Sequence, residues 1–178
     1  MKFFTAILLL LLCTACKSLY FDSFINMYCN NSQAKLIHDA DSVQCRSLFD
    51  NSLFFILVSS YTCGYCLASF DIFNNIKDQV EILDLKVPVY FVCLSENNAS
   101  EVFANFPNYK RLMKNDISWD KIEGNQPLIE TIWRESVYPE LVVLDSGKLY
   151  KSIVGVPVEE DINKLIFDIN KSFGMPQN

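Results

Sequence analysis

Six consecutive apolar residues, Leu53 to Val58, constrain the fold of this chain more than any other stretch. A run without polar alternation is typical of a strand buried on both faces, so we expect its neighbours to be parallel strands covered by helices. Farther along, apolar residues recur at helical spacing: Phe70, Ile72, Phe73, Ile76 and Val80. Cys63 and Cys66 therefore lie between the end of a buried strand and a helix.

This placement of the two cysteines matters chemically. The first turn of a helix has unpaired backbone N–H groups and the positive end of the helix dipole, which stabilise a thiolate. An ordinary cysteine has a pKa near ~8.5, and helix N-termini lower this to roughly 3.5–7.5. We therefore assign Cys63 as the nucleophile. Cys66, one turn further along, is placed to attack a mixed disulfide formed on Cys63.

A Cys-X-X-Cys pair has other uses, namely a structural disulfide, half of a zinc site or a haem attachment. Haem attachment requires histidine directly after the second cysteine, where this chain has Leu67. Zinc needs two more ligands, but the only histidine of the chain is His38, and Cys29, Cys45 and Cys93 show no paired spacing. The pattern favours a redox dithiol with no metal or organic cofactor.

The buried strand, Cys63-Gly64-Tyr65-Cys66, the amphipathic helix and a later Tyr138-Pro139 before an apolar strand resemble the thioredoxin superfamily. Within it, the likeness is to exported or lipid-anchored bacterial thiol-disulfide oxidoreductases. The resemblance implies an α/β thioredoxin-like fold, with a central mixed sheet ending in an antiparallel hairpin and helices on both faces. It also implies a cis peptide bond before Pro139 and a substrate groove beside Cys63 formed by Thr62, Gly64, Tyr65, Tyr138 and Pro139.

Two positions depart from the family pattern. Leu57 occupies the place, six residues before the first cysteine, where reductases carry a buried acid, and Thr62 replaces the usual tryptophan. A second hypothesis therefore stays open, in which the chain is a redox-inactive binding or scaffold lipoprotein with a structural Cys63–Cys66 disulfide. The first hypothesis implies protein thiols or disulfides as substrates and a redox partner protein, with the direction of electron flow undetermined.

The N-terminus has the pattern of a signal peptide, predicted to span residues 1–15. Met1-Lys2 gives a positive start, and an apolar core too short to span a membrane leads to small residues. Thr14-Ala15-Cys16 resembles the cleavage box of bacterial lipoproteins, in which Cys16 becomes the lipidated first residue, although Cys13 stands where leucine is usual. The alternative is ordinary cleavage after Ala15, which gives a soluble secreted protein. With the lipid anchor at Cys16 we expect the protein in the bacterial cell envelope, on its periplasmic side.

Length and composition fit one globular domain. The chain has 178 residues, of which 51% are hydrophobic and 20% charged, which excludes a disordered chain. The net charge of −6 and the lack of a basic run give nucleic-acid binding no electrostatic support. We expect a lipid-anchored tether over residues 16–33 and a thioredoxin-like domain over residues 34–178.

Further elements complete the predicted domain. We expect helices within 34–49, from Ser100 to Lys114 and over 127–135. We expect a buried strand over 89–94, a short strand near Ile117 and a hairpin turn at Asp145–Lys148. A last helix has its apolar stripe from Val158 to Phe173. Cys93 is interpreted as an inert core residue. Cys29 and Cys45 are interpreted either as a disulfide or as two separate thiols.

Overall fold

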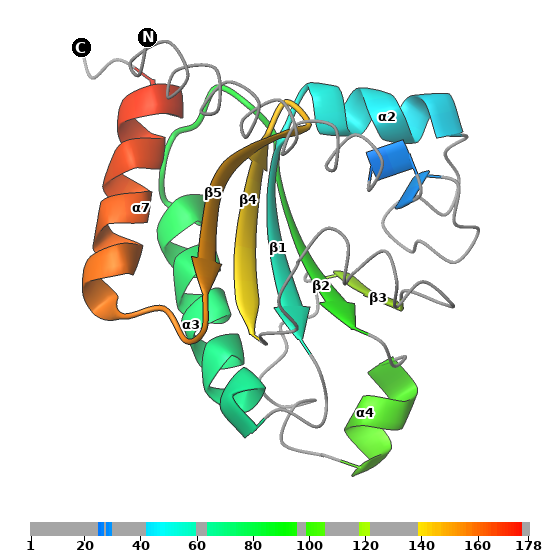
Figure 1. The fold of residues 1–178 in the computed structure, drawn as a ribbon. Coiled ribbons are helices and arrows are strands. Elements are labelled where there is room, and N and C mark those ends of the chain that lie inside the picture. Colours follow the sequence, from blue (N-terminus) through cyan, green and yellow to red (C-terminus); the bar gives the residue numbers. More distant parts are fainter. Residues whose placement is uncertain are drawn as a thin grey trace, which may run out of the picture.

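The computed structural model describes residues 25–26, 28–29, 42–59, 64–95, 99–105, 118–121 and 139–175. Its elements, in chain order, are α2 (Ser42–Asp50), β1 (Leu53–Ser59), α3 (Gly64–Glu81), β2 (Val89–Ser95), α4 (Ala99–Asn105), β3 (Ser118–Lys121), β4 (Glu140–Asp145), β5 (Lys148–Val154) and α7 (Glu159–Phe173). The strands form a five-stranded mixed sheet in the order β3-β2-β1-β4-β5 (Figure 1). The predicted α/β fold class is confirmed.

The apolar run forms the central strand, β1, and all seven of its residues are buried. It pairs in parallel with β2, with Leu53 opposite Val89, and antiparallel with β4, with Val58 opposite Glu140. The prediction of parallel neighbours is therefore right for β2 and wrong for β4. An apolar run reports burial on both faces, and burial does not depend on the direction of the adjacent strand.

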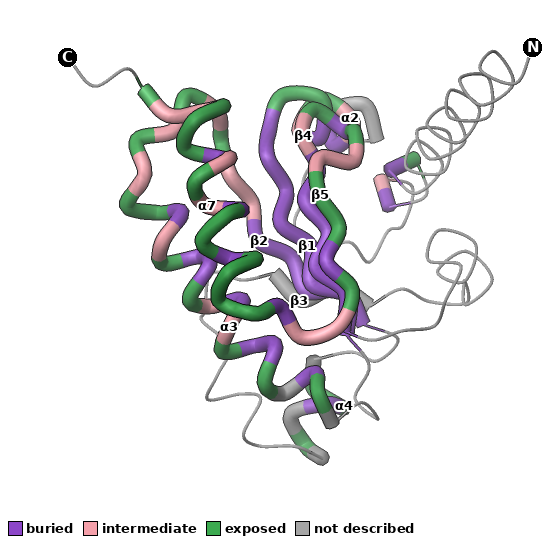
Figure 2. The backbone as a smooth tube through the Cα atoms, turned by 60° about the vertical axis from the view of Figure 1, so that its left-hand side comes forward, coloured by how far each residue is buried: buried purple, intermediate pink, exposed green. Residues whose placement is uncertain are grey.

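Alternate residues of β1 face two separate hydrophobic clusters, because successive side chains of a strand point to opposite faces. Leu53, Phe55 and Leu57 belong to the cluster that also contains the buried residues of α3 and α7. Phe54, Ile56 and Val58 belong to the cluster on the α2 side. Figure 2 shows the resulting continuous burial of β1 and β4 between the layers. Helices on both faces are thus confirmed.

Helix α3 packs on the sheet through the predicted stripe. Phe70, Phe73, Ile76 and Val80 are all buried. The ring of Phe73 meets that of Phe91 edge to face, with centroids 5.6 Å apart, so the helix lies over β2 as well as β1. This packing explains why the apolar spacing changes from a continuous run to helical periodicity after the strand.

Helix α7 covers the same face and buries Ile162, Leu165 and Ile169. Its acidic first turn complements the positive end of the helix dipole. Val158, which we expected on the buried stripe, is instead 60% exposed. The reason is that Val158 is the residue before the helix and has extended backbone, so it does not share the helical phase.

The strands β4 and β5 are joined by a two-residue turn, as predicted. Ser146 has φ of 49° and Gly147 has φ of 72°. Positive φ at both central residues gives the strands a twist that matches the sheet, and glycine adopts it without steric cost. The predicted antiparallel hairpin is confirmed by the β4–β5 pairing.

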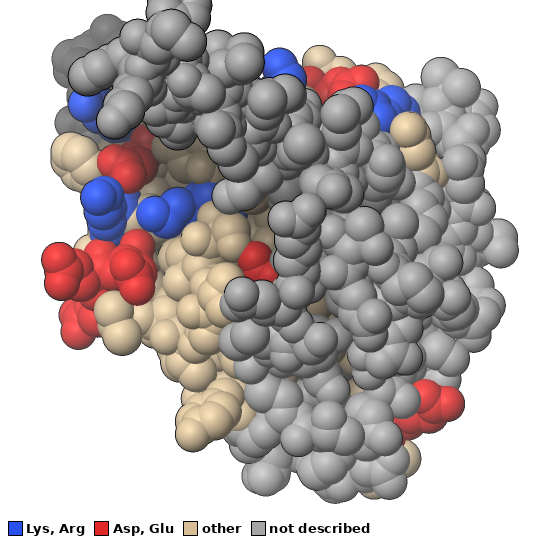
Figure 3. Space-filling view, viewed as in Figure 1, with Lys and Arg blue, Asp and Glu red and all other residues tan. Residues whose placement is uncertain are grey.

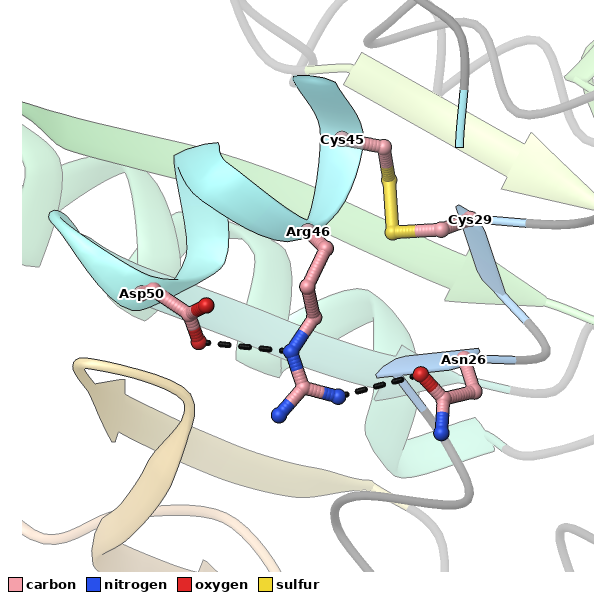
Figure 4. The surroundings of a disulfide bond; sticks show 5 residues. All are labelled: Asn26, Cys29, Cys45, Arg46 and Asp50. Atoms are coloured by element: carbon pink, nitrogen blue, oxygen red, sulfur yellow. Dashed lines mark hydrogen bonds and ion pairs between the residues drawn. A yellow bond between two sulfur atoms is a disulfide. The ribbon is translucent and has the colours of Figure 1, made fainter. Parts of the chain in front are cut away.

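On the α2 side, a short N-terminal piece packs into the core. Ile25 and Tyr28 are buried, and the Tyr28 ring meets Phe49 of α2 at a centroid distance of 5.5 Å. A disulfide joins Cys29 to Cys45 of α2 (Figure 4). The sequence left this pairing open. These residues fall in the segment expected to be a tether, so packing against the domain is already present at residue 25.

Arg46 reinforces this attachment from the next position along α2. Its guanidinium lies 3.3 Å from the Asp50 carboxylate and donates a 3.1 Å hydrogen bond to the side-chain oxygen of Asn26 (Figure 4). Both side chains of the ion pair are partly exposed, so the ion pair contributes modestly to stability.

Other predicted elements match over the part of the chain that the structure describes. The helix expected within 34–49 corresponds to α2, which ends at Asp50, and its expected start lies outside the described residues. Helix α4 begins at Ala99, one residue before the predicted start at Ser100. β3 matches the short strand near Ile117. Residues 106–114 and the helix expected over 127–135 lie outside the described residues.

Candidate redox site

Three chain segments meet at one end of the sheet. β1 ends at Ser59, and α3 begins five residues later at Gly64. β4 begins at Glu140, directly after Pro139. Because β1 and β4 are antiparallel and Val58 pairs with Glu140, the start of β4 lies beside the end of β1. The second cysteine and the predicted groove proline therefore belong to the same end of the sheet, which we call the cysteine end.

Cys66 is the third residue of α3 and is fully buried, with 0% of its surface exposed. It precedes Phe70 and Phe73 by four and seven residues, which places it on the sheet-facing stripe of the helix. A sulfur held there is shielded from large external reagents. This burial suits the predicted role of Cys66, which is to attack the sulfur of Cys63 in a mixed disulfide.

Tyr65, between the two cysteines in sequence, has the opposite environment and is 72% exposed. Its backbone carbonyl accepts a 3.2 Å hydrogen bond from the hydroxyl of Ser69, which adds a side-chain link to the first turn of α3. The start of the helix thus combines a buried sulfur with an exposed aromatic ring.

Pro139 is buried and lies immediately before β4. Its carbonyl accepts a 2.7 Å hydrogen bond from the backbone N–H of Gly155. Proline is tolerated at this place because the start of a strand can lack one ladder donor. The bond to Gly155 fixes the loop after β5 against the start of β4.

The structure brings Cys66, Tyr65 and Pro139 to the cysteine end and starts α3 at Gly64. Among the other predicted site residues, Thr62, Cys63, Tyr138 and the proposed lipidation residue Cys16 lie outside the described residues. Their predicted roles remain proposals.

Several buried polar side chains near this end were not predicted as site residues. The hydroxyl of Ser59 lies 3.4 Å from the sulfur of Cys93, and both residues are buried on the α3 side of the sheet. Cys93 is a core residue, as the sequence indicated. A polar residue at the end of an apolar strand was the available signal for Ser59, but no sequence pattern indicates Cys93 as its partner.

Glu140 is a buried carboxylate directly after Pro139 and accepts a hydrogen bond from the hydroxyl of Ser152. Glu140 and Leu141 are adjacent on β4, so their side chains point to opposite faces of the sheet. Leu141 belongs to the α3-side cluster, so Glu140 lies on the α2 side. Leu57 lies six residues before the first cysteine, where reductases of the thioredoxin superfamily carry a buried acid. Its side chain is buried in the α3-side cluster. Glu140 therefore does not simply replace that acid beneath α3.

A cavity of about 600 Å³ lies at the opposite end of the sheet, between the end of α3, the following loop and the start of β2. Its lining includes Lys77, which is buried, forms an ion pair with Glu81 and lies 6.0 Å from the centre of the Phe91 ring. No cysteine is among the described residues that line the cavity, which lies at the other end of the sheet from Cys66. Across the described ranges, His, Cys, Asp and Glu side chains form no cluster suited to a metal ion.

No protein-family model and no curated protein matches the sequence. Solved structures do match the fold. One is described as a candidate thiol:disulfide interchange protein, DsbE, from Chlorobium tepidum, with 18% identity, a TM-score of 0.50, and coverage of 71% of this chain and 83% of that one.

Two further structures show the same likeness. The thioredoxin domain of a thiol-disulfide oxidoreductase from Bacteroides vulgatus has 10% identity and a TM-score of 0.51, over 68% of this chain and 82% of that one. DsbF from MTB, in mixed oxidised and reduced forms, has 10% identity and a TM-score of 0.50, over 70% and 85%. At these identities the likeness establishes the fold, which is thioredoxin-like and resembles that of bacterial thiol-disulfide oxidoreductases.

Proposed function

We propose that this chain is an exported thiol-disulfide oxidoreductase whose redox pair is Cys63 and Cys66. The observation that carries the proposal is the complete burial of Cys66 in the first turn of α3, at the same sheet end as Pro139. A thioredoxin-like fold with a Cys-Gly-Tyr-Cys sequence at this junction is suited to disulfide exchange with other proteins.

In the proposed reaction, the Cys63 thiolate attacks one sulfur of a substrate disulfide, and the other substrate sulfur leaves as a thiolate that takes up a proton. Cys66 then loses its proton and attacks the sulfur of Cys63 in the mixed disulfide. The products are the reduced substrate and a Cys63–Cys66 disulfide. In the reverse direction a substrate dithiol becomes oxidised and the pair is reduced, so a redox partner protein supplies or removes two electrons per cycle.

The proposed location is the periplasmic side of the bacterial cell envelope. Residues 1–15 serve as the signal peptide and Cys16 carries the lipid anchor, with cleavage after Ala15 and secretion as the alternative. Within the described residues, no helix is long and apolar enough to cross a bilayer.

Trapping of mixed disulfides tests the order of attack. In Cys66→Ala the second step is blocked, so partners should accumulate as disulfides on Cys63. Cys93→Ala is the matched control, because it removes a buried cysteine from β2 and leaves the proposed pair intact. If Cys66→Ala traps no partner while the wild-type chain turns over, this assignment is wrong.

A second function, a redox-inactive binding or scaffold lipoprotein, is favoured by one observation. Leu57 places a buried apolar side chain where the family's reductases carry a proton-transferring acid. An insulin-reduction or thiol-oxidation assay separates the two functions. The oxidoreductase loses activity on Cys63→Ser, whereas a scaffold shows no activity in either form.

A further inference from the structure

We propose that the Cys29–Cys45 disulfide is a second redox-active site, which acts independently of the Cys63–Cys66 pair. A thiolate of an external dithiol attacks the sulfur of Cys29, and Cys45 leaves as a thiolate. Opening this bond releases the N-terminal piece of residues 25–29, which we call the docked segment, from α2. The disulfide is therefore a clasp whose state follows the supply of dithiol around the protein.

The two bonded cysteines differ in exposure. Cys45 is 1% exposed and precedes Phe49, which is also 1% exposed, by four residues. Residues four apart lie on the same face of a helix, so both side chains belong to the face of α2 that packs on the sheet. Cys29 is only partly buried and packs against the same cluster. A thiolate in solution therefore reaches Cys29 more easily than Cys45.

The position of Cys45 suits it to be the leaving group. It is the fourth residue of α2, within the first turn, where the backbone N–H groups lack partners inside the helix. Helical side chains tilt toward the N-terminus, which brings the sulfur of Cys45 nearer to these groups and to the positive end of the dipole. This surrounding stabilises a thiolate. A better stabilised thiolate leaves faster in disulfide exchange.

In the proposed step, a bond forms between a dithiol sulfur and the sulfur of Cys29 while the Cys29–Cys45 bond breaks. The Cys45 thiolate takes up a proton from water. The second thiol of the reagent then loses its proton and attacks the reagent sulfur bonded to Cys29, which leaves as a thiolate and is protonated. The dithiol becomes a disulfide, and its two electrons reduce the clasp.

The contacts that remain after the bond opens are non-covalent. A Cβ on Gly147 would lie 3.2 Å from Cδ1 of Ile25, so Ile25 packs on the hairpin turn. The ring of Tyr28 meets that of Phe49 at 5.5 Å between centroids. Segments held only by local contacts open at a lower free-energy cost than core strands. The docked segment should therefore open far more often once the clasp is reduced.

The polar contact of the docked segment lies at the surface. Arg46 donates a 3.1 Å hydrogen bond to the side-chain oxygen of Asn26 (Figure 4). The side chain of Arg46 is 33% exposed and that of its ion-pair partner, Asp50, is 47% exposed. Figure 3 shows acidic and basic side chains next to each other on the surface over α2. Water competes for such exposed groups, so they hold the docked segment weakly without the disulfide.

A monothiol tests which sulfur is attacked, because it stops at the mixed disulfide. The oxidised, folded wild-type chain is treated with glutathione, quenched with acid, alkylated with N-ethylmaleimide and cut with trypsin. The cysteines fall in separate peptides, 18–35 for Cys29 and 36–46 for Cys45. We expect glutathione on Cys29 and the alkyl group on Cys45. As much glutathione on Cys45 as on Cys29, or no adduct on either residue, overturns the assignment.

The rate of opening separates a redox-active bond from an inert structural one. Dithiothreitol should reduce the Cys29–Cys45 bond of the folded chain within about tenfold of the rate for the chain unfolded in urea, because access to Cys29 and the stabilised leaving group offset the protection by the fold. A reaction more than about tenfold slower in the folded chain overturns the proposed site.

Hydrogen exchange followed by mass spectrometry tests the release. On reduction of the clasp, exchange of the docked segment should accelerate by a factor at least about ten times larger than that of β1. The factors differ because β1 exchanges only when the core opens, whereas the docked segment also opens locally. Equal factors in the two places would mean that reduction weakens the whole fold, and this result overturns the clasp.

Cys63→Ser is the control for the other pair, because it cannot form a Cys63–Cys66 disulfide. The faster exchange of the docked segment should persist when this variant is reduced, and its disappearance would refute the clasp. The oxidised Cys29→Ser/Cys45→Ser chain should show the same fast exchange without any reductant. Its insulin-reduction activity is measured separately, so failure of the proposed oxidoreductase function is distinguished from failure of the clasp.

Discussion

The backbone N–H of Gly155 donates a 2.7 Å hydrogen bond to the carbonyl of Pro139. This bond joins the loop after β5 to the start of β4, beside the end of the central strand. It depends on a backbone conformation with φ of 85° at Gly155, which side chains disfavour. The geometry of the predicted groove thus depends on a residue 16 positions from Pro139 in the sequence.

Gly155→Ala should destabilise the fold by about 1–2 kcal/mol, because alanine at positive φ brings Cβ close to its own backbone. Among the described residues beyond its two chain neighbours, no atom lies within 4 Å of the added Cβ, so backbone strain is the main expected cost. Gly155→Asn should lose less, since asparagine tolerates this region better. Urea unfolding measures both variants, and equal stability of Gly155→Ala and wild type would contradict the account.

Replacing Cys29 and Cys45 together by serine should lower the free energy of unfolding by about 3 kcal/mol. The bond closes a loop with a sequence separation of 16, and its loss enlarges the unfolded ensemble. Wild type treated with a reductant should approach the stability of the double variant. An unchanged denaturation midpoint in the double variant would show that the N-terminal segment is not held by this bond.

Phe49 links α2 to the sheet through a buried apolar contact. Its ring stacks on Phe54 at a centroid distance of 4.0 Å and is 1% exposed. Phe49→Ala should cost about 3–5 kcal/mol through lost burial and the resulting cavity. Phe167→Ala is the control, because Phe167 on α7 is 66% exposed and its loss should leave stability nearly unchanged. Similar effects of the two substitutions in thermal or urea unfolding would contradict this packing.

The sequence predicted the elements that carry strong local patterns. Continuous apolarity located β1, helical spacing located α3 and α7, and a turn rich in small and polar residues located the β4–β5 hairpin. It could not predict that β4 runs antiparallel beside β1, because burial does not encode strand direction. The prediction that Val158 belongs to the buried stripe of the last helix is wrong, because apolar residues alone do not show at which residue a helix begins.

The site was predictable only in part. The position of Cys66 at a strand-to-helix junction followed from the spacing around the Cys-X-X-Cys pair, whereas its complete burial is visible only in the structure. The Cys29–Cys45 bond did not, because pairing depends on tertiary proximity between segments 16 residues apart. The same holds for the bond from Ser152 to Glu140, whose partners lie on neighbouring strands.

Disulfide exchange by this chain depends most on the reactivity of Cys63. Its position directly before α3 should lower the pKa of its thiol through the helix dipole and unpaired N–H groups. The direct measurement is the alkylation rate of Cys63 in the fully reduced chain as a function of pH, followed by peptide mass spectrometry. We expect the rate to reach half its maximum well below the ~8.5 of an ordinary cysteine. The unfolded chain supplies the reference. A half-maximum at or above the unfolded value would contradict the account.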